Sequence, residues 1–599
     1  MKMKLSNYIQ FAAILTGIIL LSSCKKYLTE NPLSSFGPNA VFGTVNNAQK
    51  AVLGVYQELT GDQGYGCRIS MYYPYDNDQM MGAAGSGDND RRDLARYTYT
   101  SGNLQIAKPF NQLYEGIERA NQCIYYIPKM SLYTSGNAQQ IGELQRLYGE
   151  ALTLRAQFYF ELVRDWGDVP AQWLPSAQLA NLSLPETDRD SIYDHILNDL
   201  QIAEPLVPWR TDVSALGDPN DERITKGAVK GLRARIALYR GGYSLRAFNS
   251  QMARDADFMD YYKIADTECL AIMNRPDEHT LDPNYQDLWQ NYICGHKMDP
   301  YGEVMFQVAM SGGTGATDSK LGYYNGPRTN GKGNSSLTIL PTYFYSFDSL
   351  DTRRDVICAP YEISSASAYV GHPITNIIDG KFRRDWTTNP SITPTSNAQY
   401  MGINWPILRF SDILLMYAEA ENMINSGPTP GAIAALDRVR ARAFGANASQ
   451  IGTPPGDQAG FQQAIINERG WEFGDEGIRK FDLIRWNLLG TYLANAKAAL
   501  ANIASGASPY SNDASNMYYL NNSTNGLVWG NSFYNPSAST TPSGYTGVPW
   551  AGSATITSTY LSNGAASLAS GFVANHSELY PIPISVLQSN PNLVQHYGY

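Results

Sequence analysis

Apolar residues recur at helical spacing over much of the chain. The clearest stretch is 150–166, where they follow one another at steps of three and four: Ala151, Leu154, Phe158, Leu162 and Trp166. A helix of 3.6 residues per turn gathers such positions on one face. This pattern predicts an amphipathic helix, and similar patterns predict helices at 110–127, 191–206, 225–239, 410–423, 431–443 and 461–489, the last with a break at 474–477.

The predicted helices often come as neighbours joined by a short turn. Ser426, Gly427 and Pro428, for example, separate 410–423 from 431–443. Pairs of this kind favour a helical-repeat scaffold, although no strict repeat of about 34 residues is visible. We therefore expect a mainly α protein with one body, whose helices occupy approximately 40–60, 104–282 and 407–500.

Three long regions lack this periodicity and are rich in Gly, Asn, Ser, Tyr and Pro: 60–103, 283–406 and 503–572. Such composition predicts loops with short strands. Binding residues often lie on long loops whose ends are fixed by a scaffold. We expect the ligand site in these regions.

The beginning of the chain has the pattern of a secretion signal. Lys2 and Lys4 precede an apolar run at 8–21, which is roughly 14 residues and shorter than the about 20 that span a bilayer. Leu21, Ser22, Ser23 and Cys24 then have lipoprotein spacing. We expect residues 1–23 to be removed and Cys24 to carry acyl chains that hold a body of residues 24–599 on a membrane.

Composition limits the kinds of ligand. The formal net charge of -10 disfavours nucleic acid as a partner. The six histidines are scattered and the cysteines lack paired C-x-x-C spacing, so no transition-metal site is expected. Aromatic residues make up 12% of the chain against 17% charged residues, with 41 tyrosines, so many tyrosine rings are expected near the surface.

Several segments, in order, resemble those of one family. They are YLTENP (27–32), FNQLYEGIERANQC (110–123), GEALTLRAQFYFELVRDWGDVP (149–170), RITKGAVKGLRARIALY (223–239), ILRFSDILLMYAEAE (407–421), ERGWEFGDEGIRKFDLIRW (468–486) and YPIPISVLQSNPNLVQ (580–595). The chain resembles the SusD/RagB-like outer-membrane lipoproteins of Bacteroidetes. The resemblance implies about four pairs of tetratricopeptide-like helices beside a loop-rich ligand region.

The resemblance also implies a location and a partner. Family members are lipid-anchored at the outer membrane and exposed on the cell surface. There they cover a SusC-like TonB-dependent transporter barrel and pass it a captured glycan, or in some relatives a peptide. On this basis we expect a binding protein without enzymatic activity and without a cofactor.

A glycan site needs aromatic rings that stack on sugar faces and polar groups that meet the hydroxyls. The first two loop regions supply both kinds of residue and correspond approximately to the regions where the family gathers its ligand-binding aromatics. The candidates are Tyr72, Tyr73, Tyr75, Asp76, Asn77, Asp78, Arg91, Arg92, Tyr97, Trp289, Tyr292, Tyr323, Tyr324, Asn325 and Arg328, with Trp289 and Tyr324 ranked first. In the third region, Trp529, Tyr534, Tyr545 and Trp550 belong either to a second binding face or to an insert that covers the helices.

Two clusters of charge have competing interpretations. Charged residues at 468–485 could suggest an acid and a base for hydrolysis, but their helical spacing favours a structural ion network. The aspartates Asp76, Asp78, Asp88 and Asp90 raise the possibility of calcium, yet their spacing is not that of an EF-hand loop. We expect solvated or turn-forming aspartates there.

Four functions remain open from the sequence. The favoured one is a glycan-binding lipoprotein that serves a transporter. A peptide-binding relative would need a larger enclosed cavity, and a surface glycoside hydrolase would need two carboxyl groups across a cleft, one with a raised pKa. A structural adhesion protein would have no saturable small ligand.

Overall fold

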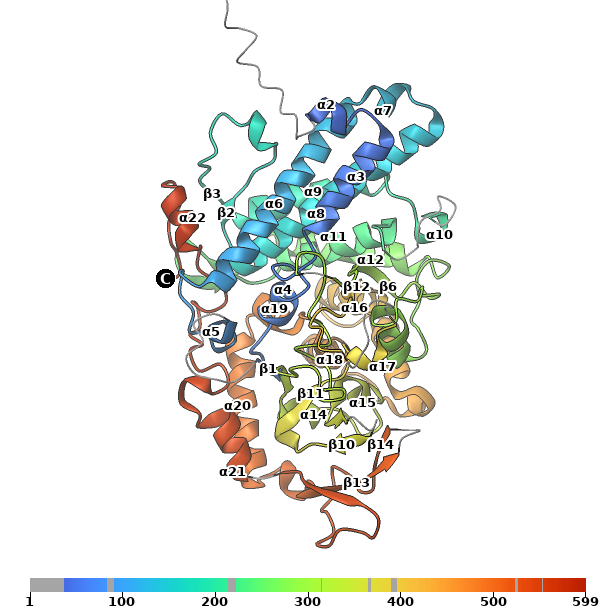
Figure 1. The fold of residues 1–599 in the computed structure, drawn as a ribbon, viewed down its shortest axis with the longest axis vertical. Helices are drawn as coiled ribbons and strands as arrows, with labels where there is room; N and C mark the ends of the chain where they lie inside the picture. The colour runs from blue at the N-terminus through green and yellow to red at the C-terminus, as the bar shows by residue number, and fades with distance from the viewer. Residues whose placement is uncertain are drawn as a thin grey trace, which may run out of the picture.

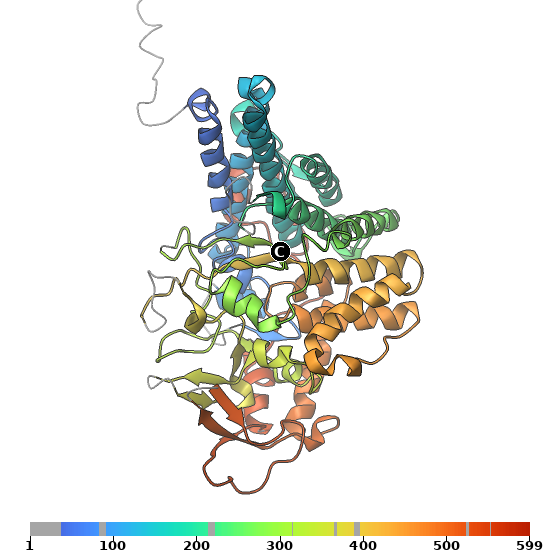
Figure 2. The same ribbon diagram turned by 90° about the vertical axis from the view of Figure 1, so that its right-hand side faces the viewer.

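The computed structural model describes residues 37–82, 91–213, 222–313, 315–364, 368–388, 396–522, 526–551 and 553–599. Cys24, the predicted signal at 1–23, Asp88 and Asp90 lie outside these ranges. Figure 2 shows helices stacked along one side of the molecule, while loops and short strands gather on the other.

The longer helices follow one another in a packed series (Figure 1). They are α3 (Val45–Gln57), α6 (Leu104–Tyr126), α8 (Ala138–Trp166), α9 (Arg189–Ala203), α11 (Lys226–Arg240), α12 (Phe258–Met273), α16 (Phe410–Ile424), α17 (Pro430–Phe444), α18 (Gln458–Glu472) and α20 (Leu489–Ser505). From α3 to α12, and on through α16 to α17, each helix contacts the next in this order. These contacts confirm the predicted mainly α scaffold of helix pairs.

Short helices lie in the segments that connect the longer helices. They are α2 (Pro38–Val41), α4 (Arg68–Met71), α5 (Arg91–Arg96), α7 (Ser131–Ser135), α10 (Arg210–Val213), α13 (Tyr285–Asp287), α14 (Pro341–Phe344), α15 (Arg353–Ile357), α19 (Arg479–Arg485), α21 (Ser553–Ile556) and α22 (Ile584–Ser589). Within the described ranges, no helix is both long enough and apolar enough to cross a bilayer.

Local chemistry fixes the ends of the helices. At the start of α8, the side chain of Asn137 accepts from the backbone N–H of Gln140, whose side chain accepts in return from the N–H of Asn137. This capping box satisfies two backbone donors that a helix start leaves open. The predicted break at 474–477 is confirmed, because Asp475 and Gly477 have φ values of 68° and 71° between α18 and α19.

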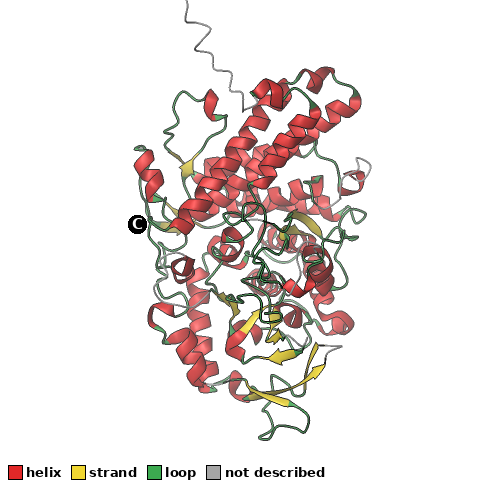
Figure 3. Cartoon of the chain, viewed as in Figure 1, coloured by secondary structure: helices red, strands yellow, loops and turns green. Residues whose placement is uncertain are grey.

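Short antiparallel strands tie the loop regions together (Figure 3). A four-stranded sheet has the order β1 (Met80–Met81), β7 (Thr338–Ile339), β11 (Ile377–Asp379), β8 (Cys358–Ala359), so it joins the first loop region to the second. In the third region β13 (Asn516–Asn522) lies between β14 (Gly526–Trp529) and β15 (Thr546–Pro549). The remaining pairs are β6 (Val304–Val308) with β12 (Trp405–Arg409), β2 (Val169–Pro170) with β3 (Glu186–Thr187), β4 (Ser244–Arg246) with β5 (Gln251–Ala253), and β9 (Tyr361–Ile363) with β10 (Tyr369–Gly371).

The aromatic residues of the third region attach its sheet to the body. The Trp550 side chain is only 1% exposed and its ring lies 5.5 Å from that of Phe344 in α14. The hydroxyl of Tyr534 accepts from Arg354 at 2.8 Å. Trp529 packs edge-on against Trp550 at 5.8 Å. These contacts pack the third region against the second loop region.

Candidate ligand-binding surface

The structure divides the predicted ligand residues by exposure. Tyr72, Asp78, Arg91, Arg92 and Tyr323 are half-buried, and Arg328 is exposed. Tyr324 is buried but keeps 9% of its surface exposed, the largest fraction among the buried candidates. The other buried candidates are Tyr73, Tyr75, Asp76, Asn77, Tyr97, Trp289, Tyr292 and Asn325.

The buried aspartate of the first loop region has a structural role here. The carboxylate of Asp76 forms an ion pair with Arg96 at 2.7 Å and accepts from the backbone N–H groups of Gly82 and Ala569, each at 2.9 Å. The half-buried Asp78 forms an ion pair with Arg479 at 2.8 Å. Both carboxylates are paired with arginines, so these two aspartates are not solvated.

Trp289, one of the two residues ranked first, is fully enclosed. Its ring meets Tyr285 and Phe382 edge-on, with centroid distances of 6.1 and 5.5 Å, and the ammonium of Lys381 lies 4.3 Å from its centroid. The buried tyrosines Tyr73, Tyr75, Tyr97 and Tyr292 likewise belong to the core. A ring with neighbours on all sides offers no face to a sugar, so the apolar part of these residues serves packing in this conformation.

Four tyrosines form a group on the loop side of the molecule, which we call the tyrosine cluster: Tyr72, Tyr323, Tyr324 and Tyr400. The Tyr324 ring meets Tyr323 edge-on at 5.0 Å and Tyr72 at 6.2 Å. Arg91 donates to the hydroxyls of Tyr324 at 2.9 Å and Tyr72 at 3.4 Å. Arg91 and Tyr324 are 233 residues apart in the chain, so folding brings the first two loop regions together at this point.

An ion pair holds the other edge of the tyrosine cluster. Lys320 contacts Asp62 at 3.0 Å, and the hydroxyl of Tyr400 donates to the same carboxylate at 3.1 Å. The ammonium of Lys320 lies 5.1 Å from the Tyr400 ring centroid and 6.0 Å from that of Tyr324. Burial alone would lower the pKa of Lys320, but its hydrogen bond to Asp62 and the charge of that carboxylate raise the pKa to about 12. Lys320 therefore stays protonated beside the rings, as the ion-pair partner of Asp62.

The tyrosine cluster is a surface rather than a pocket. The cavity under Tyr72, Arg91 and Ser336 has a volume of about 20 Å³, which is near the size of a single water. A ligand would lie across the rings and meet the guanidinium, ammonium and hydroxyl groups at their edges. Sequence reasoning did not single out Asp62, Lys320 or Tyr400, because no local motif marks them and only the fold brings them to this place.

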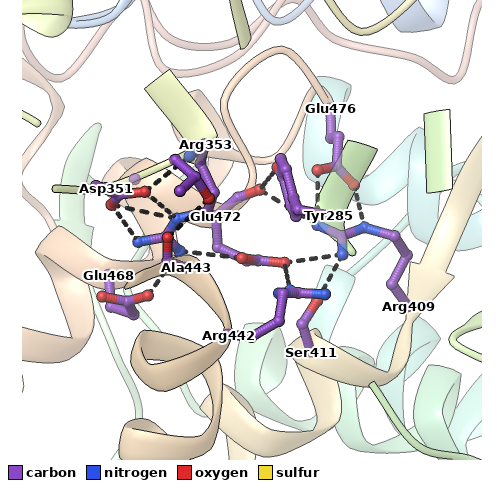
Figure 4. A network of polar contacts seen from close by, with 12 residues as sticks. Tyr285, Asp351, Arg353, Arg409, Ser411, Arg442, Ala443, Glu468, Glu472 and Glu476 are labelled. Atoms are coloured by element: carbon purple, nitrogen blue, oxygen red, sulfur yellow. Dashed lines mark hydrogen bonds and ion pairs between the residues drawn. The ribbon is translucent and has the colours of Figure 1, made fainter. Parts of the chain in front are cut away.

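The charged residues for which a structural ion network was predicted form buried ion pairs: Glu468, Arg469, Glu472, Glu476, Arg479, Asp482 and Arg485. Figure 4 shows the part of the network around Glu468, Glu472 and Glu476. The carboxylate of Glu472 contacts Arg442 at 2.6 Å, Arg409 at 2.8 Å and Arg353 at 3.0 Å. Burial alone would raise the pKa of Glu472, but these three guanidinium groups outweigh it and hold the pKa well below its usual range. Glu472 is therefore ionised and enclosed, and it cannot serve as a general acid.

Comparison with known families agrees with the sequence segments. A family model described as "SusD family" matches residues 361–599, and a second, described as "Starch-binding associating with outer membrane", matches residues 50–238. The chain belongs to the SusD-like family. SusD-like protein P25 of Formosa agariphila is 24% identical over 524 residues, which cover 81% of this chain and 91% of that protein. A SusD-like protein of Bacteroides ovatus is 23% identical over 512 residues, covering 79% and 81%.

Solved structures of the SusD-like family share the fold. A SusD homologue from Bacteroides thetaiotaomicron has a TM-score of 0.73 at 22% identity, with 93% of this chain and 98% of that chain covered. Surface glycan-binding protein A from the same species, solved with laminarihexaose, has a TM-score of 0.62 at 17% identity, covering 92% and 100%. These likenesses confirm the predicted fold class.

Proposed function

We propose that the protein binds a glycan at the cell surface through the tyrosine cluster and delivers it to a TonB-dependent transporter in the outer membrane. The observation that carries the proposal is the convergence of Tyr72, Arg91, Tyr323 and Tyr324, which were chosen from the sequence, on one surface with Lys320 and Tyr400. Aromatic rings with polar groups at their edges match the two sides of a sugar ring. Membership of the SusD-like family and the laminarihexaose complex of one structural relative support it.

The proposed role needs no chemical step. The carboxylate at the tyrosine cluster, Asp62, is engaged by Lys320 and Tyr400 rather than poised across a cleft from a second carboxyl group. The acidic side chains Glu468, Glu472, Glu476 and Asp482 are held in buried ion pairs, and the buried carboxyl group of Asp475 accepts from the hydroxyl of Tyr75. Anchoring through Cys24 and the transporter as partner are proposed from the sequence pattern and from the family, respectively.

Variants of the tyrosine cluster test the proposal. Tyr323→Ala removes a half-buried ring, and Arg91→Ala removes the guanidinium that holds Tyr324 and Tyr72. We expect each to weaken binding of the best glycan about tenfold, since that factor corresponds to about 1.4 kcal/mol, the size of one good aromatic or polar contact. Isothermal titration calorimetry measures the affinity directly.

The matched control is Tyr125→Ala, which removes a partly exposed tyrosine at the end of α6, whose hydroxyl contacts Gln178. Its affinity for the glycan should equal that of the parent protein. If Tyr323→Ala and Arg91→Ala bind the glycan as tightly as Tyr125→Ala, the tyrosine cluster is not the site. Saturable binding of peptides alone would instead favour the peptide-binding function.

A further inference from the structure

A second hollow lies between helices α18 and α20, with α14 and residues 78–79 at its floor. We call it the helix cleft; its volume is about 510 Å³, within the roughly 300–1,000 Å³ that is usual for small-molecule sites. It shares no lining residue with the small cavity beneath the tyrosine cluster. Because its walls are helices packed on the scaffold, its shape is set by rigid elements rather than by loops.

Three partly exposed aromatic rings line the helix cleft: Trp471, Tyr492 and Tyr510. Hydrogen bonds hold two of them in place. The indole N–H of Trp471 donates to the hydroxyl of Ser346 at 3.0 Å, and the side chain of Gln463 donates to the hydroxyl of Tyr492 at 2.8 Å. Rings fixed in this way lose little conformational entropy when a ligand packs against them.

The polar groups of the helix cleft include one without a partner. The exposed amides of Gln463, Asn467 and Asn495 line its rim. Deeper in, the hydroxyl of Thr342 belongs to a side chain that is only 9% exposed, and it forms no hydrogen bond with any described residue. A buried hydroxyl left unpaired costs about 1–3 kcal/mol, which a ligand hydroxyl in the cleft would recover.

The residues that line the helix cleft have no net charge. Asp78 and Arg479 at its floor form an ion pair with each other at 2.8 Å, and the other lining residues are uncharged. Gly470 lets α18 approach the floor, because a Cβ there would lie 2.8 Å from the side-chain nitrogen of Gln79. A lining with rings, amides, hydroxyls and no net charge suits a neutral ligand that has both apolar faces and many hydroxyls.

We propose that the helix cleft is a second carbohydrate site, which takes a neutral oligosaccharide. The inference rests on the proposed function for its ligand class, because a protein that captures a polymer gains from a second contact on the same chain. Two sites on one molecule raise the effective concentration of the polymer at each, so a long glycan is bound more tightly than a short one.

The test is calorimetric titration of the purified protein with hexasaccharides of neutral glucan, xylan and mannan. We expect two binding events for one of these probes. Asn495→Ala, in the cleft wall, and Thr342→Val, which exchanges the hydroxyl for a methyl of similar size, should each weaken one event at least fivefold and leave the other unchanged. Tyr323→Ala should have the opposite selectivity.

Asn502→Ala is the matched control, since Asn502 lies on the same helix as Asn495 but does not line the helix cleft. A single event that responds only to Tyr323→Ala would overturn the second site and leave the proposed function standing. A single event that responds only to Asn495→Ala and Thr342→Val would support the helix cleft and overturn the role of the tyrosine cluster. If no hexasaccharide binds, the helix cleft as a site for a neutral oligosaccharide is overturned, whereas the proposed function, which does not fix the charge of its glycan, is overturned only if no member of a wider glycan panel binds.

Discussion

At the scale of single residues, the interior of this protein is held by charge as well as by apolar packing. Glu472 has no exposed surface and accepts from three arginines. Each of these also contacts another carboxylate: Arg353 reaches Glu468, Arg409 reaches Glu476, and Arg442 reaches Glu303. Removing water from such groups is costly, and the mutual contacts offset that cost only while every partner is present. The network is therefore sensitive to the loss of a single member.

We expect Glu472→Gln to lower the free energy of unfolding by about 3–5 kcal/mol, because three buried guanidinium groups then lose their shared counter-charge. Differential scanning calorimetry checks this. The control is Glu115→Gln, which removes the 56% exposed partner of Arg119 on the surface of α6 and should cost less than about 1 kcal/mol. Equal effects of the two variants would contradict a structural network at Glu472.

The buried carboxylate of Asp412 should make the stability of the fold depend on pH. Its carboxylate lies 2.5 Å from both Arg469 and Arg235, and although burial opposes ionisation, these charges lower its pKa to about 2 from 3.8. A carboxyl group whose pKa is lower in the folded than in the unfolded state stabilises the fold at pH values above its unfolded-state pKa. This stabilisation is lost as the pH falls through its folded-state pKa. The shift corresponds to about 2 kcal/mol.

Asp412→Asn should therefore lower the free energy of unfolding by its full amount above about pH 4. The difference from the parent protein should shrink as the pH is lowered towards 2, where Asp412 also becomes neutral. Urea unfolding of both proteins at pH 5, 4, 3 and 2 measures the difference. A difference that stays constant across this range would show that Asp412 acts by shape and not by charge.

The sequence could predict the roles of these residues only where their partners lie nearby in the chain. The charges at 468–485 lie at helical spacing, so a structural network could be predicted, but Arg353, Lys381 and Arg409 come from distant segments and could not. The same limit applies to the tyrosines. Composition required many tyrosines near the surface, yet only the fold shows that Tyr323 is half-buried while Tyr73 is enclosed.

At the scale of elements, the close approach of α6 and α8 depends on a missing side chain. A Cβ added at Gly116 in α6 would lie 2.5 Å from the ring of Phe158 in α8, which is fully buried. Glycine is otherwise unfavourable inside a helix, so its presence here serves packing. Gly142 in α8 has open space around the same position.

We predict opposite effects for alanine at these two glycines. Gly116→Ala should destabilise the protein by about 1–3 kcal/mol through overpacking. Gly142→Ala should stabilise it by up to about 1 kcal/mol, because alanine has the higher helix propensity. Thermal unfolding of the two variants gives the sign of each effect, and a stabilising Gly116→Ala would show that the helices can move apart without cost.

Helices with a strong apolar stripe were predictable because their periodicity is local. The stretch 410–423 became α16 and 431–443 became α17, each shifted by one residue or so at its ends. The helix predicted at 110–127 extends further towards the N-terminus: α6 begins at Leu104, the start of the predicted scaffold segment 104–282, and the side chain of Asn103 caps the N–H of Gln105 there. The short strands of the loop regions could not be placed, since their pairing joins segments such as Met80–Met81 and Thr338–Ile339 that are far apart in sequence.

At the scale of the whole molecule, the helical scaffold supports the loop regions, and the loop regions carry the proposed binding surface. The helix pairs share one continuous core with the loop regions, which are tied by the sheet of β1, β7, β11 and β8 and present the tyrosine cluster. The cluster draws its side chains from segments near residues 62–91 and 320–400, so no single loop could form it. Fold and family were predictable from the sequence, whereas the geometry of the site required the structure.

The measurement that tests the central claim most directly is titration of the purified protein with a panel of polysaccharides and peptides, followed by product analysis of every ligand that binds. Our account predicts saturable binding of one glycan, recovered at its original length after prolonged incubation. Shortened products would contradict a capture role and indicate a hydrolase. Absence of saturable binding to any glycan would contradict the function proposed for the tyrosine cluster.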